Sequence, residues 1–368
     1  MQATHRLQEL GQSLWLDNIT RGLLIDGTLQ RYIDAFSVTG LTSNPTIFDH
    51  AIRSGGRYDA AIRQRAGERE SGEALFFALA LEDLTRAADL FRPVHDRTGG
   101  VDGWVSLEVS PLLAGDTAGT IAAAGRLHAR AQRPNLFIKI PGTPAGVPAI
   151  EASILAGVPV NVTLLFSAEQ YRAAADAYMK GIERRLAAGL DPRVASVASL
   201  FVSRWDVAVA DAVPAALRNR LGIAVAGRTY QAYRDVLASP RWGRLAAAGA
   251  RPQRLLWAST GTKDPAASDT LYVEALAAPD TINTIPEKTL HAFADHGQVH
   301  GAMPVDGGEA DATLAEFRRA GVDDAALATR LQREGTAAFD KSWKDLLECI
   351  ASKRARLEHA APTRAGQS

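Results

Sequence analysis

The chain has 368 residues, of which 46% are hydrophobic and 22% charged, values that are ordinary for a globular protein and exclude a collagen-like or disordered chain. Its 41 Lys and Arg residues balance 41 Asp and Glu residues, so composition gives no global attraction to nucleic acid or anionic membranes. The one cysteine, Cys349, excludes an intramolecular disulfide and fits a reducing cytosol. We therefore expect a cytoplasmic protein that binds anions through a local cluster.

The N-terminal segment, residues 1–13, lacks the apolar core of a signal peptide. No stretch of the chain approaches the roughly 20 apolar residues that a membrane helix needs. We therefore expect neither a secretory leader nor a membrane partner.

Short segments rich in Val, Leu and Ile alternate with longer segments of helical character. In 167–189, apolar residues recur at helical spacing behind Ser167, a candidate N-cap. Alternating strands and helices indicate parallel pairing, and eight strands predict an α/β fold of the (β/α)8 barrel type. The pattern leaves an open doubly wound sheet as the alternative. The predicted strands are 13–19, 38–44, 104–110, 135–141, 159–166, 196–203, 254–260 and 281–286.

We expect one barrel domain over residues 1–368 with additions to the basic pattern. The segment 45–103 is long for one crossover and should hold two or three helices. In chain order, the remaining parts are barrel strands within about 13–286, a mainly helical C-terminal extension over 287–358 that includes a flexible glycine-rich loop at 300–308, and a disordered tail at 359–368.

Polar side chains interrupt five of the apolar strands near the same end. In a barrel, active-site groups project from the C-terminal ends of the strands, and residues two apart share a strand face. The pattern therefore predicts a ring of polar groups around a pocket. Its members are Asp17, Thr42 with Asn44, Glu108, Lys139, and Asn161 with Thr163.

Lys139 is the most informative of these residues, because it lies in the apolar strand sequence NLFIKIP. Burying a charged amine is costly. Burial therefore favours a neutral amine, which can attack a carbonyl and form a Schiff base. A lysine that reaches solvent from a strand end, or that pairs with a carboxylate, is the alternative interpretation.

Asp17 and Glu108 place two carboxylates on different strands, an arrangement that suits separate proton-transfer roles. A salt bridge or a helix cap would explain either residue without catalysis. Magnesium binding is weakly supported, because the position where some phosphatases carry a second aspartate is occupied by Ile19. We expect no metal and no cofactor.

Two other patterns match known sites poorly. His291, His296 and His300 are spaced by five and four residues, which suits a surface helix followed by a loop better than a zinc site. The glycines of 141–149 lack the Lys-Ser/Thr ending of a phosphate-binding P-loop.

Phosphate binding is better assigned to the loops after the sixth and seventh strands, where barrels commonly bind phosphate. Arginine offers a bidentate fork, and hydroxyl groups add neutral donors. A solvated turn is the alternative for Lys263. The candidate residues are Ser199, Phe201 and Arg204 in the first segment and Ser259 and Lys263 in the second.

Several motifs, in order and at the right spacing, resemble the transaldolase family over nearly the whole chain. The Ser-Thr-Gly-Thr-Lys segment resembles the longer bacterial subfamily, in which Lys263 stands near the arginine of other transaldolases. The motifs are Gly40–Phe48, Asn135–Pro141, Pro159–Phe166, Ser199–Arg204 and Trp257–Pro265.

The resemblance implies a barrel permuted relative to other lysine-dependent aldolases, and a transfer of dihydroxyacetone between sugar phosphates. Lys139 would attack the C2 ketone of sedoheptulose 7-phosphate or fructose 6-phosphate. Glu108 would act as acid and base through a water that Thr163 positions, and Asp17 would take the C4 hydroxyl proton as the C3–C4 bond breaks. No cofactor is needed, because the protonated imine is the electron sink.

The resemblance also implies the binding residues. Asn44 and Asn161 would hold the hydroxyls of the three-carbon enamine, in a pocket lined by Thr42, Ser199 and Phe201. Arg204, Ser259 and Lys263 would hold the distal phosphate. Sugar phosphates are the only partners implied, and the protein is expected to be a monomer or a homodimer.

Two alternatives remain open on the sequence. A fructose 6-phosphate aldolase shares the fold and the lysine, but such relatives are shorter and usually carry glutamine in place of the carboxylate, so Glu108 and the length favour a transaldolase. A non-catalytic sugar-phosphate-binding barrel would tolerate loss of Lys139. Such a protein has no use for an amine between two acids.

Overall fold

The structure is a computed structural model that describes residues 2–66 and 72–359. Of the predicted tail at 359–368, all but the first residue lies outside the described residues. None of the helices in the described ranges combines the length and apolarity that crossing a bilayer requires.

Eight parallel strands form a closed barrel in which each strand pairs with its neighbours in sequence order and β1 pairs with β8. The (β/α)8 prediction is confirmed, and the open-sheet alternative is wrong. Every predicted strand exists, and the predicted starts agree to within one residue. The strands are β1 (Ser13–Leu16), β2 (Val38–Leu41), β3 (Trp104–Glu108), β4 (Leu136–Pro141), β5 (Val160–Leu165), β6 (Ser196–Phe201), β7 (Gln253–Ala258) and β8 (Ile282–Ile285).

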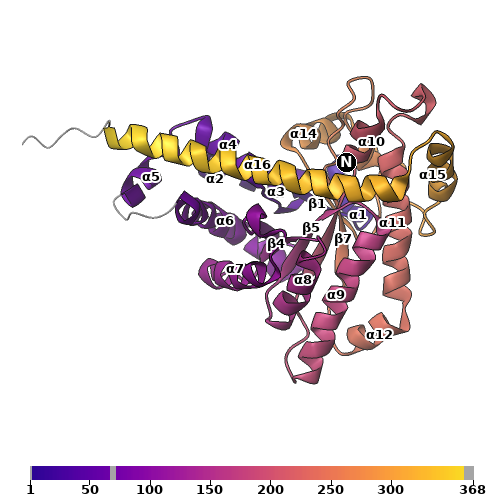
Figure 1. Cartoon of the computed structure of the whole chain (residues 1–368), viewed down its shortest axis with the longest axis horizontal. Coiled ribbons are helices and arrows are strands. Elements are labelled where there is room, and N and C mark those ends of the chain that lie inside the picture. Colours follow the sequence, from indigo (N-terminus) through magenta and orange to yellow (C-terminus); the bar gives the residue numbers. More distant parts are fainter. Residues whose placement is uncertain (1, 67–71, 360–368) are drawn as a thin grey trace, which may run out of the picture.

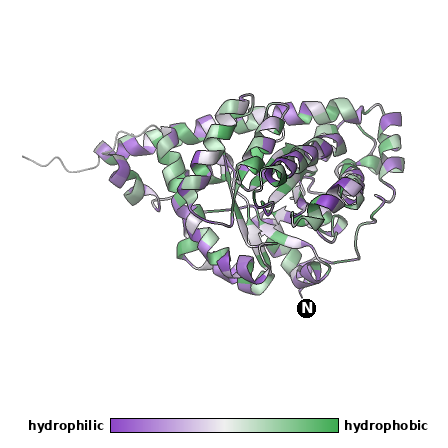
Figure 2. Ribbon diagram, turned by 90° about the horizontal axis from the view of Figure 1, so that it is seen from below, coloured by the Kyte–Doolittle hydropathy of each residue, from purple (hydrophilic) through white to green (hydrophobic). Residues whose placement is uncertain are grey.

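Helices surround the barrel, and each carries hydrophobic and hydrophilic residues along one ribbon, as expected when only one face packs inward (Figures 1 and 2). Three helices fill the long segment after β2, as predicted. The helices up to β8 are α1 (Ala3–Glu9), α2 (Arg21–Ile25), α3 (Thr28–Phe36), α4 (Pro45–Arg53), α5 (Asp59–Ala66), α6 (Gly72–Arg97), α7 (Thr117–Ala131), α8 (Gly146–Leu155), α9 (Ala168–Ala187), α10 (Ser203–Val209), α11 (Leu221–Ala238), α12 (Pro240–Ala247) and α13 (Leu271–Ala275).

The predicted cap of α9 is present, because the Ser167 side chain accepts a hydrogen bond from the backbone N–H of Gln170. This bond satisfies one of the N–H groups that a helix start leaves without a partner.

Aromatic side chains fill the end of the barrel opposite the site. The rings of Trp104 and Phe137 stack with centroids 4.1 Å apart, and the indole N–H of Trp15 donates to Asp102 at 2.7 Å. A Cβ at Gly40 would lie 2.7 Å from the Trp15 ring, so only glycine fits there. The inside of the barrel at this level is therefore a packed core.

The chain after β8 is mainly helical, as expected, and consists of α14 (Glu287–His296), α15 (Ala310–Arg319) and α16 (Asp324–His359). The glycine-rich segment 300–308 is a loop, and its flexibility stays a prediction. The 36-residue helix α16 runs across the molecule in Figure 1. Its Gln332 side chain donates to the carbonyls of Gly142 and Leu164, each at 3.0 Å, so α16 is attached to the mouth where β4 and β5 end.

Candidate active site

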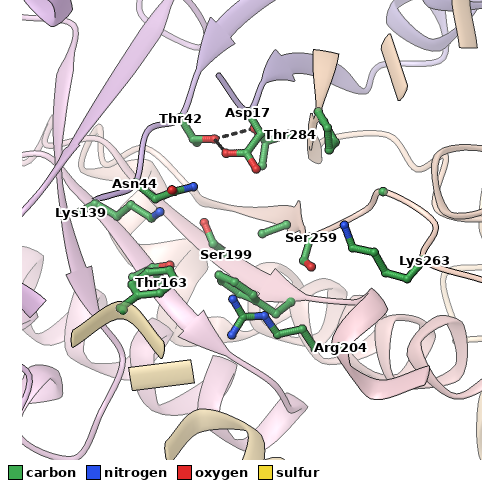
Figure 3. A pocket seen from close by; sticks show the side chains of 15 residues that line it. Asp17, Thr42, Asn44, Lys139, Thr163, Ser199, Arg204, Ser259, Lys263 and Thr284 are labelled. Atoms are coloured by element: carbon green, nitrogen blue, oxygen red, sulfur yellow. Dashed lines mark hydrogen bonds between the residues drawn. The ribbon is translucent and has the colours of Figure 1, made fainter. Parts of the chain in front are cut away.

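A cavity opens at the C-terminal mouth of the barrel, where the polar strand residues converge (Figure 3). All of the predicted site residues line it except Glu108 and Asn161, which are buried in the barrel wall. The lining residues are Asp17, Thr42, Asn44, Lys139, Thr163, Ser199, Phe201, Arg204, Ala258, Ser259, Gly261, Lys263, Thr284, Pro286 and Phe339.

Lys139 lies in β4 with its side chain 7% exposed, and its amine lies 3.3 Å from a carboxylate oxygen of Glu108. The two residues are partners in the β3–β4 register, so strand pairing itself brings the acid to the amine. The amine also donates to the backbone carbonyl of Ser43 at 3.2 Å. The lysine is therefore both paired with a carboxylate and part of the cavity lining, and its role as a Schiff-base nucleophile stays a prediction.

Glu108 is 5% exposed, and burial raises the pKa of its carboxyl group, while the nearby Lys139 amine works in the opposite direction. Apart from the ion pair with Lys139, its oxygens have no hydrogen-bond partner among the described residues, and neither does the buried hydroxyl of Thr163. Buried polar oxygens without partners are rare in proteins. This part of the site has the hydrogen-bonding capacity to hold a further polar group, such as a water.

Asp17 follows β1 on the other side of the cavity and accepts a hydrogen bond from the Thr42 hydroxyl at 2.9 Å. The Thr42 hydroxyl lies 2.7 Å from that of Thr284, so Thr284 can donate to Thr42 while Thr42 donates to Asp17. Burial raises the pKa of Asp17, and the positive charge of Lys139 and the bond from Thr42 oppose this rise. A carboxyl group tuned in this way can exchange a proton under mild conditions.

The positive side chains of Arg204 and Lys263 lie at the far side of the cavity from Lys139 (Figure 3). Arg204 lies over the Phe201 ring at 5.0 Å, and burial lowers the pKa of its guanidinium. Neither Arg204 nor Lys263 forms an ion pair within the part of the chain that the structure describes. Ser259, with a left-handed φ of 56°, lies between them, so this end can bind an anion.

Comparison with known proteins identifies the family of this barrel. The family model described as Transaldolase/Fructose-6-phosphate aldolase matches residues 14–350. The chain belongs to this family. Among its relatives, a protein named Transaldolase from Thiobacillus denitrificans is 48% identical over 359 residues, which are 95% of this chain and 100% of that protein. The resemblance drawn from the motifs and the prediction of an enzyme are thereby confirmed.

Two further relatives carry the same name. Transaldolase from Parafrankia sp. is 48% identical over 354 residues, which are 94% of this chain and 96% of that protein. Transaldolase from Thermobifida fusca is 46% identical over 363 residues, which are 95% of this chain and 98% of that protein. The predicted function agrees with these names, and the similarity covers the barrel and the C-terminal helices alike.

The two asparagines differ in their surroundings. The Asn44 side-chain oxygen caps α4 by accepting from the N–H of Ile47, which leaves its NH2 group for a ligand. Asn161 is fully buried and accepts from Ser199 at 2.7 Å while donating to the Ser106 hydroxyl at 3.1 Å. Ser106 was missed by the sequence analysis, although its position two residues before Glu108 assigns it to the same strand face.

Other residues that line the cavity were also missed. Thr284 carried a signal, since it is a polar residue inside the predicted strand 281–286. Phe339 carried none, because it is an aromatic residue at helical spacing in α16, far from the barrel strands in sequence. Only the packing of α16 across the mouth brings Phe339 to the cavity.

The three histidines lie on α14 and the loop after it, as predicted. They bind different partners: His291 contacts the Tyr32 hydroxyl at 2.9 Å, and His296 contacts Asp269 at 2.9 Å. His300 lies 3.8 Å from Glu274. Within residues 2–66 and 72–359, no three His, Cys, Asp or Glu side chains are grouped closely enough to hold a metal ion.

Proposed function

We propose that this protein is the transaldolase of the pentose phosphate pathway and acts in the cytoplasm. It transfers a dihydroxyacetone unit from sedoheptulose 7-phosphate to glyceraldehyde 3-phosphate, which gives erythrose 4-phosphate and fructose 6-phosphate. One observation carries the proposal. The buried Lys139 amine, 3.3 Å from Glu108, faces the same cavity as Asp17 and the unpaired cation Arg204. An amine, two acids and an anion site are what this reaction requires.

In the first step, the neutral Lys139 amine adds to the C2 ketone, and the carbinolamine loses water to form a protonated imine. Glu108 takes a proton from the amine and returns it to the departing hydroxyl through a water held with Thr163. The partnerless oxygens of both residues support this role. The Glu108 carboxylate lies 3.3 Å from the amine and is therefore positioned to exchange a proton with it.

In the second step, Asp17 takes the proton of the C4 hydroxyl, and the C3–C4 bond breaks. The electron pair of that bond flows into the protonated imine and gives an enamine on Lys139, while the aldehyde product leaves. The acceptor aldehyde then binds, the enamine carbon attacks it, and Asp17 returns the proton to the new hydroxyl. A carboxyl group with a raised pKa suits both directions of this transfer.

The other predicted site residues are assigned to substrate binding. Asn44 and Asn161 hold the hydroxyls of the three-carbon unit, in a pocket completed by Thr42, Ser199 and Phe201. Arg204, Ser259 and Lys263 hold the distal phosphate, supported by the absence of a carboxylate partner for either cation among the described residues. We further propose that residues 1–368 act as one barrel domain, as a monomer or a homodimer.

Trapping of the imine tests the proposal. Borohydride added with fructose 6-phosphate should reduce the imine and leave a stable adduct on Lys139, which mass spectrometry of a protease digest would locate. Lys139→Met should abolish the adduct. Lys353→Met is the matched control, because Lys353 is equally buried but lies outside the cavity. An adduct that persists in Lys139→Met would refute the proposal.

A further inference from the structure

Phe339 is an aromatic residue of the site that the proposed steps do not use. It lies on α16, it is 8% exposed, and it lines the cavity. Its ring centroid lies 5.7 Å from the Lys139 amine and 5.8 Å from the Arg204 guanidinium carbon. The ring therefore adjoins both the end of the cavity that forms the imine and the end that binds phosphate.

Several contacts hold the helix that carries Phe339. About two turns before Phe339, the side chain of Gln332 donates to the carbonyls of Gly142 and Leu164. A Cβ at Gly335 would lie 3.0 Å from Leu164 and 3.2 Å from Arg204, so this position lets the helix approach the barrel closely. Beyond Phe339, Trp343 packs edge-on against Phe76 with centroids 4.9 Å apart. Phe339 is thus fixed over the mouth from both sides.

The enamine on Lys139 can react in two ways, and an apolar lining of the cavity favours one of them. Attack on the acceptor aldehyde forms a carbon–carbon bond and completes the transfer. Protonation of the same carbon instead forms a carbon–hydrogen bond and an imine, which a water molecule hydrolyses to free dihydroxyacetone and the lysine amine. The second fate requires a proton donor and water beside the amine, and excluding water suppresses it.

Phe339 and Phe201 face this region, with ring centroids 6.5 Å apart, and neither side chain carries an exchangeable proton. From this geometry we infer that Phe339 of α16 is a specificity-determining residue that keeps bulk water from the enamine and so directs the reaction to transfer rather than to release of dihydroxyacetone. The inference rests on the proposed function, and it assigns a chemical role to a helix outside the barrel.

The experiment measures free dihydroxyacetone against transferred product, with fructose 6-phosphate as donor and erythrose 4-phosphate as acceptor. Phe339→Gln and Phe339→Met replace the ring by side chains of similar length, of which only glutamine attracts water. Phe339→Gln should raise the ratio of release to transfer by about tenfold, the factor that about 1.4 kcal/mol in relative barrier height produces. Phe339→Met should stay within about twofold of the unmodified protein.

Leu346→Ala is the control for general loosening of α16, because Leu346 is fully buried and does not line the cavity. An unchanged ratio in Phe339→Gln, or an equal rise in Leu346→Ala, would overturn the inference. Borohydride trapping on Lys139 in each variant separates this result from the proposed function. Failure of trapping in the unmodified protein would refute the Schiff base itself, whereas normal trapping with an unchanged ratio refutes only the role of Phe339.

Discussion

Lys139 and Lys353 have almost the same burial, with side chains 7% and 8% exposed, but they lie in regions of different character. Lys353, near the end of α16, donates to the carbonyls of Ile52 and Gly55 and pairs with Asp59 at 2.9 Å. Three oxygen atoms therefore surround this amine, and two of them accept hydrogen bonds from it. Lys139, at the barrel mouth, has one carbonyl and one carboxylate, each more than 3 Å away, and faces a cavity.

The difference matches a structural role for Lys353 and the chemical role that we propose for Lys139. Lys353 supplies a positive charge and hydrogen bonds at the C-terminal end of α4, where helices leave carbonyls without partners. It ties α16 to α4. Lys139 is held less completely, and its carboxylate neighbour can accept a proton. The surroundings of the amine, and not its burial alone, therefore distinguish the two lysines.

Replacing each lysine by methionine gives the largest effects and could break this comparison. Lys139→Met should lower kcat by at least about a thousandfold, because the nucleophile is lost, and should leave the protein folded. Lys353→Met should keep kcat and lower the free energy of unfolding by about 1–3 kcal/mol, because two carbonyls and Asp59 lose their donor. A coupled assay of aldose production and urea denaturation would measure the two effects.

The comparison fails if Lys353→Met, once folded, loses turnover as completely as Lys139→Met. Lys341→Met is the control for surface lysines, because Lys341 is exposed on the same helix and pairs only with Asp345. Such exposed pairs contribute little to stability, so neither turnover nor unfolding should change measurably.

Much of the site could be predicted from the sequence, because every second residue of a strand points to the same face of the sheet. A lysine or a glutamate in an apolar strand is conspicuous, and parallel strands bring such residues to one end of the barrel. The pairing of Lys139 with Glu108 could not be predicted, because it depends on the register between β3 and β4. Lys353 gave no signal, because a lysine in a long amphipathic helix is ordinary until packing buries it.

The position of Phe339 at the cavity could not be predicted from the sequence. Its helix was expected, but the direction in which a terminal helix packs is decided by long-range contacts such as Gln332 with the ends of β4 and β5. A phenylalanine at helical spacing predicts only burial. The sequence therefore identified the charged groups and the Phe201 ring of the cavity, and it missed the Phe339 ring.

Asp17, like Lys139, is a charged group of the cavity with few hydrogen bonds. Thr42 donates to one of its carboxylate oxygens, and the other oxygen has no hydrogen bond within the described residues. Asp17→Asn keeps an oxygen for Thr42 but removes the proton acceptor. Turnover should fall by about a hundredfold or more, the usual contribution of a general base. Borohydride trapping on Lys139 should remain, because imine formation precedes the step that Asp17 serves.

The comparison of initial trapping rate with turnover rate is the measurement for Asp17→Asn. Normal turnover would remove Asp17 from the mechanism. A trapping rate that falls as far as turnover would instead assign Asp17 to imine formation, the role proposed for Glu108.

Removing the hydroxyl groups of Thr42 and Thr284 should give the smallest effects. These variants test how much hydrogen bonding alone contributes to the reactivity of Asp17. Burial raises the pKa of Asp17, and the bond from Thr42 lowers it. Thr42→Val removes that bond, so the pKa rises further and the carboxyl group stays protonated to higher pH. The acid limb of the kcat/KM profile should therefore move to higher pH, with activity on that limb falling about threefold to tenfold, as expected for one hydrogen bond.

Thr284→Val acts one bond further away, since Thr284 lies 2.7 Å from the Thr42 hydroxyl and does not bond Asp17 itself. Thr42 can still donate to Asp17, so the acid limb should move in the same direction but activity on it should fall only about twofold. The pH profile of each single variant and of the double variant gives the measurement. If Thr284 acts through Thr42 alone, the double variant should match Thr42→Val, because the second change then has no hydrogen bond left to weaken. Additive effects would mean that Thr284 contacts the substrate directly. Thr42 and Thr284 would then be two independent binding groups and not a chain of hydroxyls that acts on Asp17.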